Sequence, residues 1–70
     1  MKRYGVFKRL PNGSTLWVCP SNDLTEAKTK MVESAIKTRH EHFIHDFTLG
    51  RTVANSREEL MDVGHRTKET

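Results

Sequence analysis

The 70-residue sequence predicts an α+β domain of the order ββαββ, in which a four-stranded antiparallel sheet carries one helix packed on one face. Two stretches, about residues 3–19 and 43–54, are rich in aromatic and β-branched residues, and each is interrupted by a turn that contains glycine. The segment between them repeats its apolar residues with the period of a helix. We therefore expect a single domain over residues 1–55, and a polar C-terminal segment over residues 56–70 that is a short helix or disordered.

The first hairpin is predicted from its turn. Residues 10–13, Leu-Pro-Asn-Gly, fit a type I turn that ends in a left-handed glycine. If Leu10 lies opposite Ser14, then Phe7 lies opposite Trp17 on the neighbouring strand. Side chains alternate between the two faces of a strand, so the sequence separates a more apolar face from a second one. The residues expected to face the helix are Tyr4, Val6, Lys8, Leu10, Leu16 and Val18.

The helix is predicted from its apolar stripe and its first residues. Asp23 is a good N-cap, and Glu26 stands three residues later, where a capping box requires it. The periodicity predicts a helix over about residues 24–38. The stripe that would face the sheet consists of Leu24, Ala27, Met31, Val32, Ala35 and Ile36.

The second hairpin repeats the plan of the first. Residues 47–50, Phe-Thr-Leu-Gly, form the turn, and residues 43–47 and 51–54 form the two strands. One set of alternating positions is the more apolar, and we expect it to face the helix; it consists of Phe43, His45, Phe47 and Val53. The other set is then expected on the outer face, and it consists of His42, Ile44, Asp46, Thr52 and Ala54.

Several stretches resemble short bacterial proteins of ββαββ form to which no activity is assigned. They are the Pro11-Asn12-Gly13 turn, Trp17-Val18-Cys19, the helix start at residues 23–28, and residues 47–54 with Gly50-Arg51. The similarity covers about residues 3–55. The resemblance implies a fold and a bacterial origin, and it implies no activity.

Composition and cysteine content bound the class of protein. Hydrophobic residues make up 34% of the chain and charged residues 30%, and no stretch approaches the roughly 18 apolar residues of a membrane span. Residues 1–4 start basic, and no apolar stretch of signal-peptide length follows them. The single cysteine, Cys19, excludes an internal disulfide framework and agrees with a reducing compartment. We expect a cytoplasmic protein without a membrane partner.

Catalysis, metal binding and cofactor binding are not expected. His42 and His45 point to opposite faces of a regular strand, so they do not converge with His40 on one ion. A lone cysteine such as Cys19 is more often a small packed apolar residue than a nucleophile. One sheet with one helix also leaves little room for a cavity that would shelter a small-molecule substrate.

The predicted outer face of the sheet holds the candidate binding residues. An exposed aromatic group of this kind is either covered or used in binding. The candidate anchors are Phe7 and Trp17, and Arg3 and Arg9 are the flanking charges; Ile44 and Cys19 are expected on the same face. Residues 1–20 contain four basic and no acidic residues, which favours an anionic partner.

Three explanations of this face compete. In the first, the C-terminal segment folds back and places Leu60, Met61 and Val63 over it. In the second, a protein covers it, either a second copy in a homodimer or another chain. In the third, single-stranded nucleic acid stacks on the rings while arginines contact the phosphates. Only two aromatic residues are expected on this face, and the acidic Asp46 is expected beside them, which would repel phosphates. We therefore expect a protein-binding module, with nucleic-acid binding as the alternative. The sequence leaves the partner's identity, the oligomeric state and the strand order open.

Overall fold

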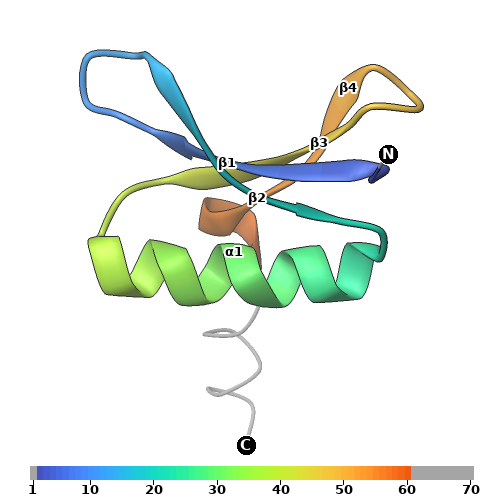
Figure 1. Ribbon diagram of the computed structural model, residues 1–70. Coiled ribbons are helices and arrows are strands. Elements are labelled where there is room, and N and C mark those ends of the chain that lie inside the picture. The colour runs from blue at the N-terminus through green and yellow to red at the C-terminus, as the bar shows by residue number, and fades with distance from the viewer. Residues whose placement is uncertain (1, 61–70) are drawn as a thin grey trace, which may run out of the picture.

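The computed structural model describes residues 2–60 and confirms the predicted α+β layout. The four strands form one antiparallel sheet in the order β2-β1-β3-β4, and helix α1 covers one of its faces (Figure 1). The elements in chain order are β1 (Tyr4–Arg9), β2 (Thr15–Ser21), α1 (Leu24–Thr38), β3 (His42–Asp46) and β4 (Arg51–Asn55). Within the described part of the chain, no helix has the length and apolar content to cross a membrane.

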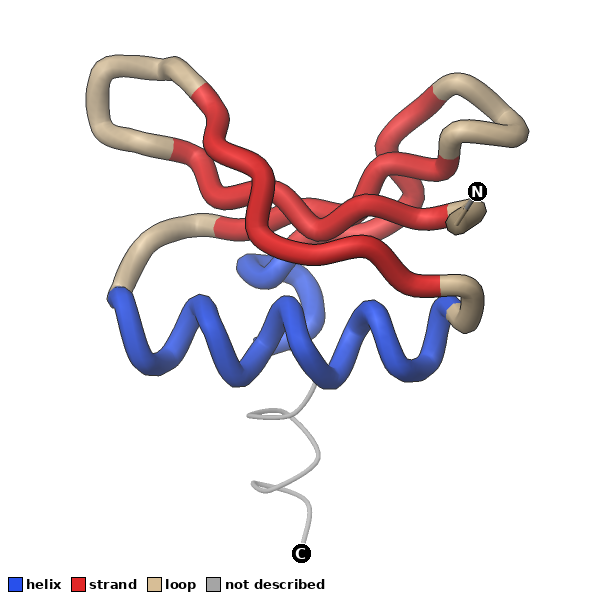
Figure 2. Tube along the Cα trace, viewed as in Figure 1, coloured by secondary structure: helices blue, strands red, loops and turns tan. Residues whose placement is uncertain are grey.

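A short helical turn follows β4. Residues 56–60 are helical and lie on the same side of the sheet as α1 (Figure 2). The Lys28 ammonium and the Glu59 carboxylate join this turn to α1 at 3.3 Å. The start of the predicted polar segment is therefore helical, and residues 61–70 lie outside the described residues.

Helix α1 has the predicted bounds and the predicted N-cap, but the prediction that Ile36 faces the sheet is wrong, because its side chain is 62% exposed. The Glu26 backbone N–H donates to the Asp23 carboxylate at 3.4 Å. The Glu26 side chain does not close a capping box: its carboxylate accepts from the Ser21 hydroxyl at 3.1 Å and pairs with Lys30 at 3.3 Å. These two partners, the hydroxyl first, hold the pKa of Glu26 below its ordinary value.

The register of the first hairpin agrees with the prediction near its turn and departs from it further along. Phe7 pairs with Trp17 as expected, but a bulge follows, so that Val6 faces Cys19 and not Val18. A second bulge occurs where β4 pairs with β3. Both bulges therefore involve the edge strands, where a bulge interrupts the row of backbone groups that another strand would pair with.

The pairing of β1 with β3 decides which side of the second hairpin faces the helix. Val6 lies opposite Ile44, so Ile44 shares the face of Val6 and is fully buried under α1. The prediction that Ile44 lies on the outer face is therefore wrong, as is the prediction that Phe43, His45 and Phe47 face the helix. Val53, from the same predicted set, does pack against the core as expected. The buried apolar core consists of Tyr4, Val6, Ala27, Met31, Ala35, Ile44 and Ala54.

The helix side of the sheet buries polar side chains, and two of them, His42 and Asp46, had been expected on the outer face. His42, Asp46 and Ser56 are each 2% exposed or less. Each has a partner: the Ser56 hydroxyl accepts from the His42 backbone N–H at 2.8 Å, and a ring nitrogen of His42 bonds to the His40 carbonyl oxygen at 2.8 Å. Hydrogen bonding makes their burial tolerable, because an unpaired polar group would cost stability there.

The tips of both hairpins curve away from α1. Residues 10–14 and 47–50 rise from opposite ends of the sheet, so that the outer face lies between them (Figures 1 and 2). This curvature explains why Leu16, which was expected to face the helix, is 48% exposed.

Candidate functional site

The sheet face opposite α1 carries a cluster of five rings, which we call the aromatic face. Phe7 occupies its centre, since β1 pairs Phe7 with Trp17 on one side and with Phe43 on the other. The predicted anchors Phe7 and Trp17 are therefore on the outer face, as expected. The complete cluster consists of Phe7, Trp17, Phe43, His45 and Phe47.

Three of these rings were assigned to the wrong side by sequence reasoning. Phe43, His45 and Phe47 alternate along one strand, and that pattern alone does not say which face they occupy. The signal that could have found them lies in a different strand: aligning Val6 with Ile44 places Phe43 beside Phe7.

The rings pack on one another in a continuous network. Phe7 and Phe43 stack with centroids 5.4 Å apart and an angle of 12° between the planes. Phe7 meets Trp17 edge to face at 5.3 Å, and Trp17 meets Phe47 at 6.2 Å and 29°. His45 completes the network against Phe47 at 5.2 Å. Such pairs add to the stability gained from burial alone.

Gly5 provides the space for the two most exposed rings. A Cβ atom at this position would lie 2.8 Å from the Trp17 ring and 2.9 Å from the Phe47 ring. The absence of a side chain at Gly5 thus leaves room for both rings. Trp17 is 53% exposed and Phe47 44% exposed, although they close over the strand backbone at this point.

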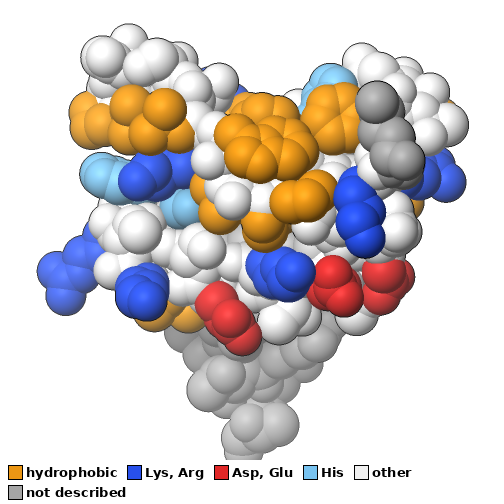
Figure 3. Space-filling view, in the orientation of Figure 1, with side chains coloured by type: hydrophobic (Ala, Val, Ile, Leu, Met, Phe, Trp, Pro, Cys, Tyr) orange, Lys and Arg blue, Asp and Glu red, His pale blue; other side chains and the backbone are white. Residues whose placement is uncertain are grey.

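A shallow groove continues from these rings toward the N-terminus. Lys2, Trp17, Pro20 and Phe47 line it, and its surface is almost entirely apolar. In the space-filling view, hydrophobic side chains gather over the sheet in the hollow between the two hairpin lobes, and charged side chains lie below them around α1 (Figure 3).

The two arginines that were expected to flank the rings differ in their contacts. The Arg3 guanidinium donates two hydrogen bonds to one Asp46 carboxylate oxygen, at 3.1 and 3.2 Å, and lies 5.3 Å from the centroid of the Tyr4 ring. The Arg9 guanidinium lies 5.0 Å from the centroid of the Phe43 ring. Arg9 therefore borders the aromatic face as expected, whereas Arg3 is held in an ion pair.

Asp46 was expected on the outer face and is instead 1% exposed. Its carboxylate accepts from the Thr48 and Leu49 backbone N–H groups at 2.8 and 3.0 Å, and so caps the second hairpin turn. Burial acts to raise the pKa of Asp46, but hydrogen bonds from Arg3 and from those two amides outweigh it and hold the pKa below its ordinary value. Asp46 is thus an ionised structural residue.

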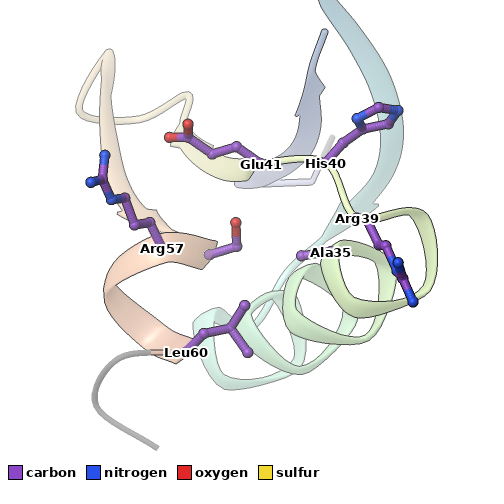
Figure 4. A pocket seen from close by; sticks show the side chains of 7 residues that line it. Ala35, Arg39, His40, Glu41, Arg57 and Leu60 are labelled. Carbon is purple, nitrogen blue, oxygen red and sulfur yellow. The ribbon is translucent and has the colours of Figure 1, made fainter. Parts of the chain in front are cut away.

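Leu60 does not cover the aromatic face. It lies on the helix side of the sheet and points toward α1, where it lines a pocket together with Ala35 (Figure 4). Of the three explanations of this face, the one in which Leu60 folds over Phe7 and Trp17 is therefore contradicted, and Met61 and Val63 lie outside the described residues. Within residues 2–60, no segment covers the aromatic face.

The pocket beside Leu60 is bordered by charged residues that point away from one another. Arg39, directly after α1, and Arg57, on the helical turn, extend from opposite sides of it (Figure 4). Its remaining lining includes His40 and Glu41 from the loop before β3. The side chains do not converge on a point that a ligand would occupy.

The remaining chemically reactive residues are dispersed. His42 is buried under α1 while His45 belongs to the aromatic face, so the two point to opposite sides as expected. The prediction that Cys19 lies on the outer face is wrong, because the bulge pairs it with Val6 and it is a free, half-buried thiol packed against the core. Among residues 2–60, no group of three histidine, cysteine or carboxylate side chains is arranged to hold a metal ion.

Comparisons of the chain with protein-family models, with curated proteins and with solved structures give no match. The resemblance to bacterial ββαββ proteins therefore stays a prediction.

Proposed function

We propose that this chain is a non-enzymatic interaction module that contacts a protein through its aromatic face. The observation that carries the proposal is the exposure of Trp17 and Phe47 at the surface of a packed ring cluster. Large aromatic side chains are the usual anchors of protein interfaces, because each buries a large area with little loss of side-chain entropy. A cytoplasmic location belongs to the same proposal and is supported by the free thiol of Cys19.

Single-stranded nucleic acid is the alternative occupant, and the arrangement of the rings supports it less well. Bases stack on ring faces that are open, but Phe7 and Phe43 turn their faces toward each other, and Arg9 lies over Phe43. Arg3 is in addition neutralised by Asp46 and is not free for a phosphate. Two findings nevertheless favour nucleic acid: the face carries five rings where two were expected, and the acidic Asp46 is not on it.

The test compares the full chain with two serine variants. Trp17→Ser removes the proposed anchor, which is 53% exposed, and Ile36→Ser removes a somewhat more exposed apolar side chain, 62% exposed, from helix α1. Each protein is cross-linked in a cell extract before and after nuclease treatment, and any partner is then purified and tested again by itself. Circular dichroism checks that each variant is folded.

The proposal expects a protein partner, or a second copy of the chain, that survives nuclease treatment, is kept by Ile36→Ser and is lost by Trp17→Ser. Binding must reappear between the purified components. A partner that disappears with nuclease supports the nucleic-acid alternative. Equal retention by all three proteins contradicts a role for the aromatic face.

A further inference from the structure

The aromatic face lies at the bottom of a trough. The two hairpin tips, residues 10–14 and 47–50, rise on opposite sides of it, and the ring cluster lies between them (Figures 1 and 3). The groove beside Trp17 and Phe47 continues this trough. A convex, elongated partner fits such a surface better than a flat one.

The trough is basic at its borders and contains no carboxylate on the outer strand positions. Arg9 borders it at one end of β1 and Lys2 at the other. Two acidic residues lie off the strands near these borders: Glu41, directly before β3, whose backbone carbonyl accepts from the Arg9 N–H at 2.7 Å, and Glu26 of α1, whose charge interacts with that of Lys2. The strand register leaves only neutral or basic side chains on the outer positions: Gly5, Phe7, Arg9, Thr15, Trp17, Pro20, Phe43, His45, Thr52 and Asn55. Within residues 2–60, no ion pair involves Lys2 or Arg9.

This charge distribution disfavours a second copy of the chain as the occupant. Two such faces in contact would bring the cations of one close to those of the other, with no carboxylate on the outer strand positions between them, and like charges placed together disfavour an interface. The occupant that complements the trough is therefore apolar where it meets the rings and acidic where it meets Lys2 and Arg9.

We propose that the trough binds an acidic amphipathic helix of a partner protein. This inference rests on the proposed function and adds the partner's chemistry to it. Lys2 and Arg9 are separated by about 23 Å of extended strand, which accommodates a helix about 10–12 Å across with one cation on each side. Apolar side chains of the helix pack on Trp17 and Phe47, and its flanking glutamates meet Lys2 and Arg9. The sheet would then carry a helix on each face.

The test uses two synthetic helical peptides and the full chain. Both peptides are about 18 residues long, enough to form a helix, and carry the same leucine stripe without tryptophan. One has glutamates on both sides of the stripe and the other has lysines. Trp17 is the single tryptophan of the protein, so its fluorescence reports occupancy, and titration calorimetry gives the affinity.

The glutamate peptide is expected to bind at least about tenfold more tightly than the lysine peptide, and salt should narrow this difference. The double variant Lys2→Glu/Arg9→Glu should reverse the preference, and both positions are exposed, so the fold is expected to persist. Equal affinity for the two peptides, an unchanged preference in the double variant, or tighter binding of an oligothymidylate would overturn the inference.

The Trp17→Ser variant separates failure of this inference from failure of the proposed function. Suppose that the unaltered chain binds both peptides with equal affinity, and that calorimetry shows weaker binding of both by Trp17→Ser. The inference about charge then fails, and the aromatic face remains a contact surface. If Trp17→Ser, with its fold verified, binds both peptides as the unaltered chain does, both proposals fail. Ile36→Ser serves as the matched control in each arm and should bind as the unaltered chain.

Discussion

Trp17 and Phe47 come from opposite sides of β1 and meet over the backbone of Gly5, with their ring centroids 6.2 Å apart. A residue without a side chain at the middle of a sheet usually weakens a strand. Here it lets two half-exposed rings settle on the sheet and contact each other. The surface that we propose for binding thus depends on a residue that makes no side-chain contact itself.

Replacing Gly5 by alanine should lower the free energy of unfolding by about 1–3 kcal/mol. The added Cβ atom would lie within 3.0 Å of both the Trp17 and the Phe47 rings, so at least one ring must move. Chemical denaturation measures the loss, and a shift in Trp17 fluorescence reports the displacement.

The control for this prediction is the same change in a Trp17→Ala background. There the added methyl group should cost clearly less, because one of the two obstructing rings is gone. An equal cost in both backgrounds would show that the backbone, and not the rings, requires glycine at position 5.

The pair formed by Arg3 and Asp46 should make stability depend on pH in the acid range. The folded-state pKa of Asp46 is lowered, so its contribution is fully present above the unfolded value, about 3.9, and is lost as the pH falls through the lower folded value. Unfolding free energies of the chain and of Asp46→Asn, measured from about pH 2 to pH 6, should therefore converge toward acid pH and separate above about pH 4.

Removing the guanidinium offers an independent check of this cause. Arg3→Met takes away the first of the groups that lower the pKa of Asp46, and leaves the two turn amides in place. The acid dependence attributable to Asp46 should shrink in this variant without vanishing. A pH profile identical to that of the unaltered chain would mean that the turn amides alone keep Asp46 ionised.

The helix could be predicted from the sequence because its determinants are local. The apolar repeat, the Asp23 cap and the change of pattern after Thr38 all lie within or next to α1, and the helix runs over the expected residues. The first hairpin turn is local in the same way: Gly13 has φ 91°, as the predicted left-handed glycine requires.

The face of the second hairpin could not be predicted in this way. Phe43 and Ile44 compete for the core, and the choice depends on how β3 aligns with β1, about 37 residues away in the chain. Burying the Ile44 side instead gathers Trp17 and the three phenylalanine rings on one surface, where they cover one another, and hydrogen bonds compensate the burial of Asp46. The candidate site was therefore half predicted: its β1 and β2 residues, but not Phe43 and His45 of β3 or Phe47 directly after it.

Arg39, directly after α1, should be improved by glycine. It has φ 59°, a left-handed conformation that costs a residue with a side chain about 1–2 kcal/mol, while its N–H bonds to the Ala35 carbonyl oxygen at 2.8 Å. Arg39→Gly should raise the unfolding free energy by about 0.5–1 kcal/mol. This gain is smaller than the strain that is relieved, because glycine also has more freedom than arginine in the unfolded chain. Denaturant titration measures this change, and a destabilised variant would show that the arginine side chain makes a larger contribution than the strain it causes.

The core that supports the aromatic face is small, and one charge should destroy it. Met31 lies at the middle of α1, is fully buried, and belongs to the only core cluster found among residues 2–60. Met31→Asp would place an unpaired carboxylate there and should lower the unfolding free energy by at least about 3–5 kcal/mol, enough to unfold a domain of this size.

Ile36→Asp is the matched control for this prediction. It introduces the same charge in the same helix at a side chain that is 62% exposed, and should change the unfolding free energy by no more than about 0.5 kcal/mol. Far-ultraviolet circular dichroism and thermal unfolding distinguish the two, and a cooperative transition in Met31→Asp near that of the unaltered chain would mean that α1 does not close the core of this domain.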